Sequence, residues 1–190
     1  MDLEVFLLAN HFPFNIMIKP CGPQCNLACE YCYYTSKERL YPGADFRMSY
    51  AMLEEFTRQM IDAQMGTEVP FIWQGGEPTL MGLDFYQEAV RMQNKYTKPH
   101  QKIINILQTN GTHITSEWCA FFREHHFLIG LSLDGPPRIH NDYRYDKSGN
   151  AQFGLVMQAV RHLKMTKLTL ISCVACMTRT STTRERYTNT

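Results

Sequence analysis

An alternation of short apolar runs with longer amphipathic stretches restricts the fold of this chain more than any other feature. Five apolar runs are short enough to be strands: residues 15–19, 69–74, 102–109, 127–134 and 167–174. Four stretches between them have helical periodicity: residues 48–64, 83–96, 116–125 and 152–165. Such alternation indicates βαβ units, so the sequence predicts an α/β fold with a parallel sheet.

The helix predicted at 48–64 illustrates the pattern. Ser49 precedes it as a candidate N-cap. Five apolar side chains are spaced to share one helical face, which we expect to be buried: Met52, Leu53, Phe56, Met60 and Ile61.

Glycine-rich and polar segments follow four of the predicted strands. They are the cysteine-rich loop at 21–32 and residues 75–78, 108–111 and 134–136. The carboxyl ends of parallel strands meet at one edge of a sheet, where active sites of such folds collect. Glycine and proline also mark ordinary turns, which is the alternative for each segment taken alone.

Composition excludes several classes of function. The chain has 190 residues, enough for one domain, and a formal net charge of +1. That charge gives no reason to expect a nucleic acid or an anionic membrane as partner. The N-terminus lacks the features of a signal peptide, and no apolar stretch is long enough to span a membrane. We therefore expect a cytoplasmic protein, whose clustered cysteines are metal ligands or redox groups.

The cysteine-rich loop predicts an iron–sulfur site. Cys25, Cys29 and Cys32 follow the spacing Cys-x-x-x-Cys-x-x-Cys. Protein thiolates usually bind all four irons of a [4Fe–4S] cluster. Three thiolates leave one iron open to the amino and carboxylate groups of S-adenosylmethionine (SAM). Structural zinc is the alternative, with Cys173 and Cys176 as a distant second pair. Cys21 does not fit the triad and is expected to be a free thiol.

Several motifs, in order along the chain, resemble the radical SAM superfamily and, more narrowly, the anaerobic sulfatase-maturating enzymes. They are Ile18-Lys19-Pro20, Cys29-Glu-Tyr-Cys32-Tyr-Tyr34, Trp73-Gln-Gly-Gly-Glu-Pro-Thr-Leu80, Leu107-Gln-Thr-Asn-Gly111, Gly130-Leu-Ser-Leu-Asp-Gly-Pro136, Ile139-His-Asn141 and Arg144. The resemblance covers residues 14 to about 174. It implies a partial TIM-like (β/α) barrel of the radical SAM type.

The resemblance also implies roles for individual residues. The cluster ligands would be Cys25, Cys29 and Cys32, and the SAM contacts would be Tyr31, Gly76, Ser132 and Arg144. Contacts to a substrate peptide are expected from Tyr34, Gln74 and Gln108. The carboxylate that serves the family as catalytic base has no counterpart in this sequence, so no catalytic residue is predicted.

The implied reaction is oxidation of a cysteine or serine in a sulfatase to Cα-formylglycine. Its cofactors would be a [4Fe–4S] cluster and SAM. Its partners would be the sulfatase polypeptide and an electron donor such as flavodoxin or ferredoxin, with no nucleic acid and no membrane. Two alternatives stay open: another peptide-modifying radical SAM enzyme, and a non-catalytic remnant that binds iron–sulfur or another metal.

The resemblance divides the chain into three parts: an N-terminal extension at 1–13, a core at 14–174 and a tail at 175–190. The core is expected to be incomplete, with about five β/α units. The tail is rich in Thr and Arg and has no apolar periodicity, which suggests a frameshift or premature stop. We therefore expect a truncated fragment of low activity. A naturally disordered tail is the alternative.

Overall fold

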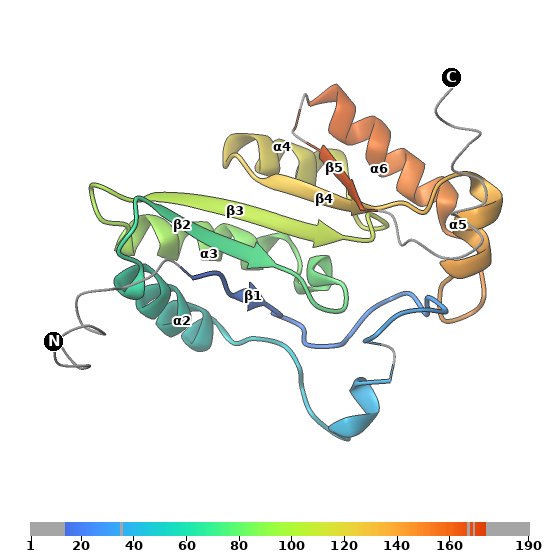
Figure 1. Ribbon diagram of the computed structural model, residues 1–190, viewed down its shortest axis with the longest axis horizontal. Helices are drawn as coiled ribbons and strands as arrows, with labels where there is room; N and C mark the ends of the chain where they lie inside the picture. Colours follow the sequence, from blue (N-terminus) through green and yellow to red (C-terminus); the bar gives the residue numbers. More distant parts are fainter. Residues whose placement is uncertain (1–13, 35, 167, 169, 174–190) are drawn as a thin grey trace, which may run out of the picture.

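A five-stranded sheet forms the centre of the structure, a computed structural model that describes residues 14–34, 36–166, 168 and 170–173. The strands are β1 (Met17–Ile18), β2 (Glu68–Trp73), β3 (Lys102–Thr109), β4 (Leu128–Ser132) and β5 (Leu170–Cys173). They lie side by side in chain order, and every neighbouring pair is parallel (Figure 1). This topology is that of a (β/α) barrel wall, so the predicted α/β class and partial barrel are confirmed.

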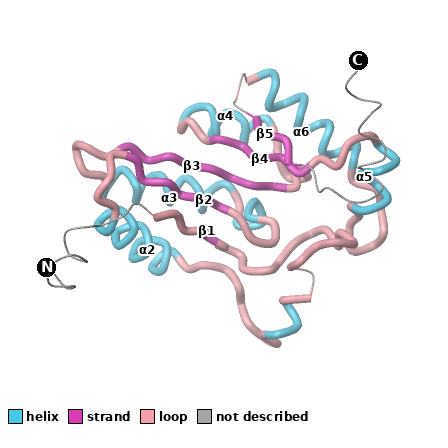
Figure 2. The backbone as a smooth tube through the Cα atoms, in the orientation of Figure 1, coloured by secondary structure: helices cyan, strands magenta, loops and turns pink. Residues whose placement is uncertain are grey.

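Helices connect the strands (Figure 2). They are α2 (Tyr50–Ala63), α3 (Leu83–Tyr96), α4 (Ser116–Glu124), α5 (Pro137–Tyr143) and α6 (Phe153–Met165), with short 3-10 helices at η1 (Glu38–Leu40) and η2 (Pro78–Met81). Ser49 caps α2 as predicted, because its side chain accepts a hydrogen bond from the Met52 backbone N–H at 3.2 Å. Helix α5 was not among the predicted elements. The chain enters it through Pro136 and Pro137, and proline is well tolerated at the first helical position.

The two faces of the sheet have different environments. Val69, Phe71 and Trp73 alternate along β2 and are buried in one core with side chains of α2, α3, α4 and α6. The intervening Ile72, together with Ile106 on β3, is only half-buried. The prediction for α2 was wrong at Met52, whose side chain is 60% exposed. Leu53, Met60 and Ile61 are buried in the core as predicted.

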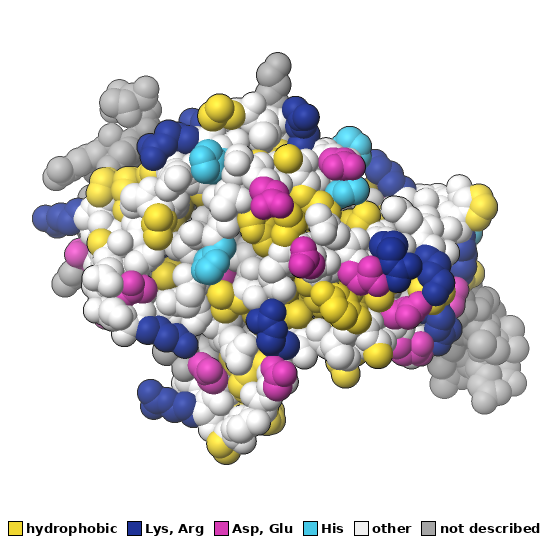
Figure 3. Space-filling view, turned by 180° about the vertical axis from the view of Figure 1, so that it is seen from behind, with side chains coloured by type: hydrophobic (Ala, Val, Ile, Leu, Met, Phe, Trp, Pro, Cys, Tyr) yellow, Lys and Arg dark blue, Asp and Glu magenta, His cyan; other side chains and the backbone are white. Residues whose placement is uncertain are grey.

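The outer surface carries mixed charge. Lys, Arg, Asp and Glu side chains are interspersed on the face seen in Figure 3. Several form short ion pairs on α2 and α3, such as Arg58–Glu55 at 2.7 Å and Arg91–Glu88 at 2.6 Å. Within the described residues, no helix is long and apolar enough to cross a membrane. The predicted N-terminal extension at 1–13 and the predicted tail at 175–190, which contains Cys176, lie outside the described residues.

Candidate cofactor site

The turn after β2 holds one side of the cysteine-rich loop. The backbone N–H of Gly76 donates to the Gly22 carbonyl and that of Glu77 to the Gln24 carbonyl, each at 2.8 Å. A Cβ at position 76 would lie 1.9 Å from the Gln24 carbonyl oxygen. Glycine at position 76 therefore lets the loop pack against the strand end. This steric reason is separate from the contact with SAM that the resemblance implies for Gly76.

The segment after α5 holds the other side of the loop. Leu27 and Asp146 form an antiparallel bridge, and the Ala28 N–H donates to the Tyr145 carbonyl at 2.8 Å. A further bond joins the Glu30 N–H to the Tyr143 carbonyl at 3.0 Å. Arg144 is thereby carried to the loop that contains the three cysteines.

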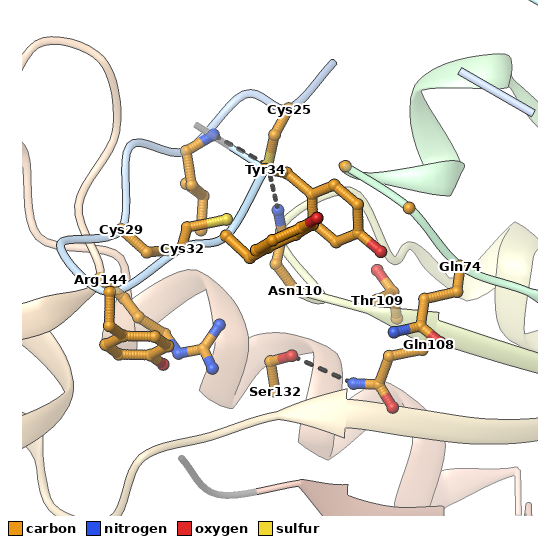
Figure 4. Close-up of a pocket in the computed structure, with 15 residues that line it drawn as sticks. Cys25, Cys29, Cys32, Tyr34, Gln74, Gln108, Thr109, Asn110, Ser132 and Arg144 are labelled. Atoms are coloured by element: carbon orange, nitrogen blue, oxygen red, sulfur yellow. Dashed lines mark hydrogen bonds between the residues drawn. The ribbon is translucent and has the colours of Figure 1, made fainter. Parts of the chain in front are cut away.

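The three predicted cluster ligands line one cavity of about 500 Å³ (Figure 4). Cys25, Cys29 and Cys32 form no disulfide. Within the described part of the chain, no three His, Cys, Asp or Glu side chains converge as ligands of a single metal ion. Three thiols that line one cavity match the three-thiolate ligand set predicted for a [4Fe–4S] cluster.

Burial favours the protonated form of two of these thiols, Cys25 and Cys29. It raises the pKa of Cys25 to about 12, and it also raises the pKa of Cys29. Both thiols are therefore protonated at neutral pH in the protein without metal. Since iron binds the thiolate, cluster assembly must release these protons.

A buried ion pair supports the part of the cavity wall that Arg144 forms, on the side near Cys29 and Cys32 in Figure 4. Arg144 donates from Nε to Asp134 Oδ2 at 2.7 Å and from Nη2 to Oδ1 at 3.3 Å. The Tyr31 hydroxyl donates to the same carboxylate. Burial and this hydrogen bond raise the pKa of Tyr31, so its hydroxyl stays protonated. Figure 4 shows the guanidinium of Arg144 directed into the cavity, where it can meet an anionic group.

The ends of the neighbouring strands β3 and β4 form the floor of the cavity. Gln108 at the end of β3 donates from Nε2 to Ser132 Oγ on β4 at 3.1 Å. Gln108 is paired in register with Gly130, where a Cβ would lie 2.1 Å from Gln108 Oε1. Glycine at position 130 therefore makes room for the Gln108 side chain over the sheet.

All ten residues predicted for the site line this cavity: Cys25, Cys29, Tyr31, Cys32, Tyr34, Gln74, Gly76, Gln108, Ser132 and Arg144. Their roles as ligands and contacts stay predictions. The prediction did not include Asn110, which also lines the cavity, or Asp134, which holds Arg144. Both belong to polar segments that follow strands, which was the signal available in the sequence.

Comparison with known proteins places the chain in a family. The family model of the radical SAM superfamily matches residues 20–184. The chain belongs to the radical SAM superfamily, and its cofactors are accordingly a [4Fe–4S] cluster and SAM.

Within this superfamily, the chain is similar to anaerobic sulfatase-maturating enzymes. The chain is 46% identical to a serine-type anaerobic sulfatase-maturating enzyme of Bacteroides thetaiotaomicron over 153 residues, covering 80% of this chain and 37% of the relative. It is 39% identical to a cysteine-type enzyme of Clostridium perfringens over 164 residues, covering 85% and 44%. The chain thus spans less than half the length of these curated relatives.

Solved structures of an anaerobic sulfatase-maturating enzyme have a similar fold. Anaerobic sulfatase-maturating enzyme anSMEcpe with bound AdoMet superposes with a TM-score of 0.81 at 36% identity, covering 91% of this chain and 45% of that one. The same enzyme with AdoMet and the Cp18Cys peptide gives a TM-score of 0.76 at 37% identity, covering 84% and 42%. The fold and family predicted from the sequence are therefore confirmed.

Proposed function

We propose that this chain is the SAM-binding part of an enzyme that oxidises a cysteine or serine of a sulfatase to Cα-formylglycine. The observation that carries the proposal is the single cavity that collects three thiols, an arginine and a floor of amide and hydroxyl groups. The sulfatase-maturating names of its relatives supply the substrate class. Flavodoxin or ferredoxin is the proposed class of electron donor.

The cavity assigns a task to each group of residues. Cys25, Cys29 and Cys32 would hold the cluster through their thiolates. Arg144, kept in place by Asp134, would bind the carboxylate of SAM through its remaining N–H groups. When bound, the cluster and SAM supply one electron and a 5′-deoxyadenosyl radical that removes a hydrogen atom from carbon.

A second group of residues that line the cavity would position the substrate. Tyr34, Gln74 and Gln108 would orient the peptide so that the Cβ hydrogen of its cysteine or serine faces the radical source. Tyr34, which is half-buried, would cover part of the cavity and so limit the access of water to radical intermediates. The substrate radical would then lose one proton, and one electron to an acceptor such as oxidised flavodoxin or ferredoxin. A serine gives the aldehyde directly, and a cysteine gives a thioaldehyde that water hydrolyses with release of sulfide.

Anaerobic reconstitution with iron and sulfide tests the assignment of the site. The parent chain should bind about four irons, absorb broadly in the visible range and release 5′-deoxyadenosine from SAM under a reductant. Cys25→Ala, Cys29→Ala and Cys32→Ala should each abolish this release. Cys119→Ala is the matched control, since Cys119 is buried in the apolar core away from the cavity.

The substrate is tested separately with a sulfatase peptide that contains the target cysteine or serine. Formylglycine detected by mass spectrometry, even at a low level, supports the proposal. SAM cleavage with a different peptide product identifies another peptide-modifying enzyme. Stoichiometric zinc, with neither visible absorbance nor SAM cleavage, identifies a non-catalytic metal-binding protein and refutes the proposal.

A further inference from the structure

Asn110 places an amide beside one of the proposed cluster ligands. It follows β3 directly, and only 7% of its surface is exposed. Its Nδ2 atom lies 3.7 Å from Cys25 Sγ and donates a second hydrogen bond to Asn26 Oδ1 at 2.9 Å. Figure 4 shows this contact, with the Asn110 amide reaching from the strand end toward the sulfur.

The orientation of this amide is fixed by its other atoms. Asn110 Oδ1 accepts hydrogen bonds from the Thr112 backbone N–H at 2.9 Å and from Thr112 Oγ1 at 2.8 Å. Asn26 Nδ2 donates to Thr112 Oγ1 at 2.9 Å, which closes a ring of three side chains. Because Oδ1 is occupied by donors, the NH₂ group must face Asn26 and Cys25.

The backbone of Asn110 is anchored as well. Its N–H donates to Glu77 Oε2 at 2.7 Å, and Glu77 is only 1% exposed. The other oxygen of Glu77 accepts from the hydroxyls of Thr109 at 2.7 Å and Thr79 at 2.6 Å. The carboxylate therefore joins the ends of β2 and β3, and it holds Asn110 at a set distance from the cysteine-rich loop.

We propose that Asn110 is a positioning residue that raises the reduction potential of the cluster by donating an N–H···S hydrogen bond to the Cys25 thiolate. This inference rests on the assignment of Cys25 as a cluster ligand in the proposed function. Reduction adds negative charge to the cluster and its sulfurs, and a donor aimed at a sulfur stabilises that charge. The low exposure of the Asn110 amide strengthens the interaction, since little water competes with it.

Asn110 differs from the other donor to the same sulfur. The backbone N–H of Leu27 lies 3.3 Å from Cys25 Sγ, but it belongs to the loop itself and no side-chain substitution removes it. Asn110 comes from a neighbouring strand end. The reduction potential of the cluster therefore depends on how the end of β3 is positioned relative to the cysteine-rich loop.

Redox titration of the reconstituted chain, followed by electron paramagnetic resonance of the reduced cluster, tests the proposal. Asn110→Ala removes the donor, and Asn110→Asp replaces it with a carboxylate of similar shape that only accepts. We expect the equilibrium constant for reduction to fall threefold to tenfold in Asn110→Ala, about 30–60 mV for one electron. Asn110→Asp should shift the midpoint further in the same direction.

Asn26→Ala is the matched control. It removes an amide adjacent to Cys25 in sequence that donates no hydrogen bond to the sulfur. The substitution also removes the Asn26 Oδ1 that accepts from Asn110, but Thr112 still holds Asn110 Oδ1, so the Asn110 amide keeps its orientation toward Cys25. A smaller shift than in Asn110→Ala supports the proposal, and an equal or larger shift overturns it. Unchanged potentials in both Asn110 variants also overturn it, as does loss of iron from both while Asn26→Ala retains it. Failure of the parent chain to bind a cluster would instead refute the proposed function.

Discussion

Substitution of Gly76 by alanine tests the packing that holds the cysteine-rich loop. The added Cβ would lie 1.9 Å from the Gln24 carbonyl oxygen and 2.6 Å from the Pro23 carbonyl carbon. Both atoms are backbone, so the clash cannot be relieved by rotating a side chain. The loop must move away from the end of β2.

Two terms give the expected magnitude. Overpacking of a tight contact costs about 1–3 kcal/mol. Movement of the loop also weakens the hydrogen bonds from Gly76 to Gly22 and from Glu77 to Gln24, each with a net contribution of about 0.5–1.5 kcal/mol. We therefore expect the free energy of unfolding to fall by about 2–6 kcal/mol. The iron content after reconstitution should fall with it, because Cys25 follows Gln24 directly.

Urea denaturation under anaerobic, reducing conditions, followed by circular dichroism, measures the change. Gly154→Ala is the control, since nothing lies within 4 Å of the Cβ it would add in α6. That variant should be neutral or more stable by up to about 1 kcal/mol, because alanine favours helix over glycine. The reasoning fails if Gly76→Ala unfolds within about 0.5 kcal/mol of the parent chain and binds iron fully.

Three further predictions concern buried groups. Asp134→Asn should lower the free energy of unfolding by about 3 kcal/mol, because Arg144 loses a buried carboxylate partner. The same substitution should weaken SAM binding measured by calorimetry. Unchanged SAM affinity would contradict the role of Asp134 in positioning Arg144. Burial lowers the pKa of His140 from 6.5 to about 4, so the unfolded chain takes up this proton first as the pH falls. Stability is then complete above pH 6.5 and declines by up to about 3 kcal/mol toward pH 4. In denaturation series at several pH values, His140→Asn should flatten this decline, and an equal decline in both proteins would refute the assignment. Cys21→Ala should cost about 1 kcal/mol while iron and sulfide per chain stay unchanged, since Cys21 donates to the Glu77 carbonyl and lies outside the triad.

The regular elements were predictable where periodicity is strong. The bounds of β3 and α3 agree with the predicted 102–109 and 83–96. Strand β1 covers only two of the five predicted residues, because it pairs with β2 on one side only among the described strands. Helix α5 was missed because two consecutive prolines were interpreted as a loop, although proline suits a helix start.

The part of the site that depends on the spacing of residues within one loop was predictable from the sequence. The Cys25, Cys29 and Cys32 spacing lies within one loop and can be recognised from the sequence alone. Asp134 contacts Tyr31 and Asn110 contacts Cys25, and both partners are far away in the sequence, so the local pattern did not distinguish either residue from an ordinary turn residue. Periodicity indicates which face of an element is buried, but not which polar side chains meet across a cavity.

The bridge between Leu27 and Asp146 has a consequence for how the protein is made. The cysteine-rich loop leaves the ribosome early, but its backbone partners in the segment after α5 are synthesised much later. Contacts that are distant in sequence form slowly, because a long intervening chain must first be ordered. The nascent loop is therefore exposed to solvent and oxidants until β4 and α5 have folded. We therefore expect cluster insertion to be a late step, after the segment that follows α5 has folded against the loop.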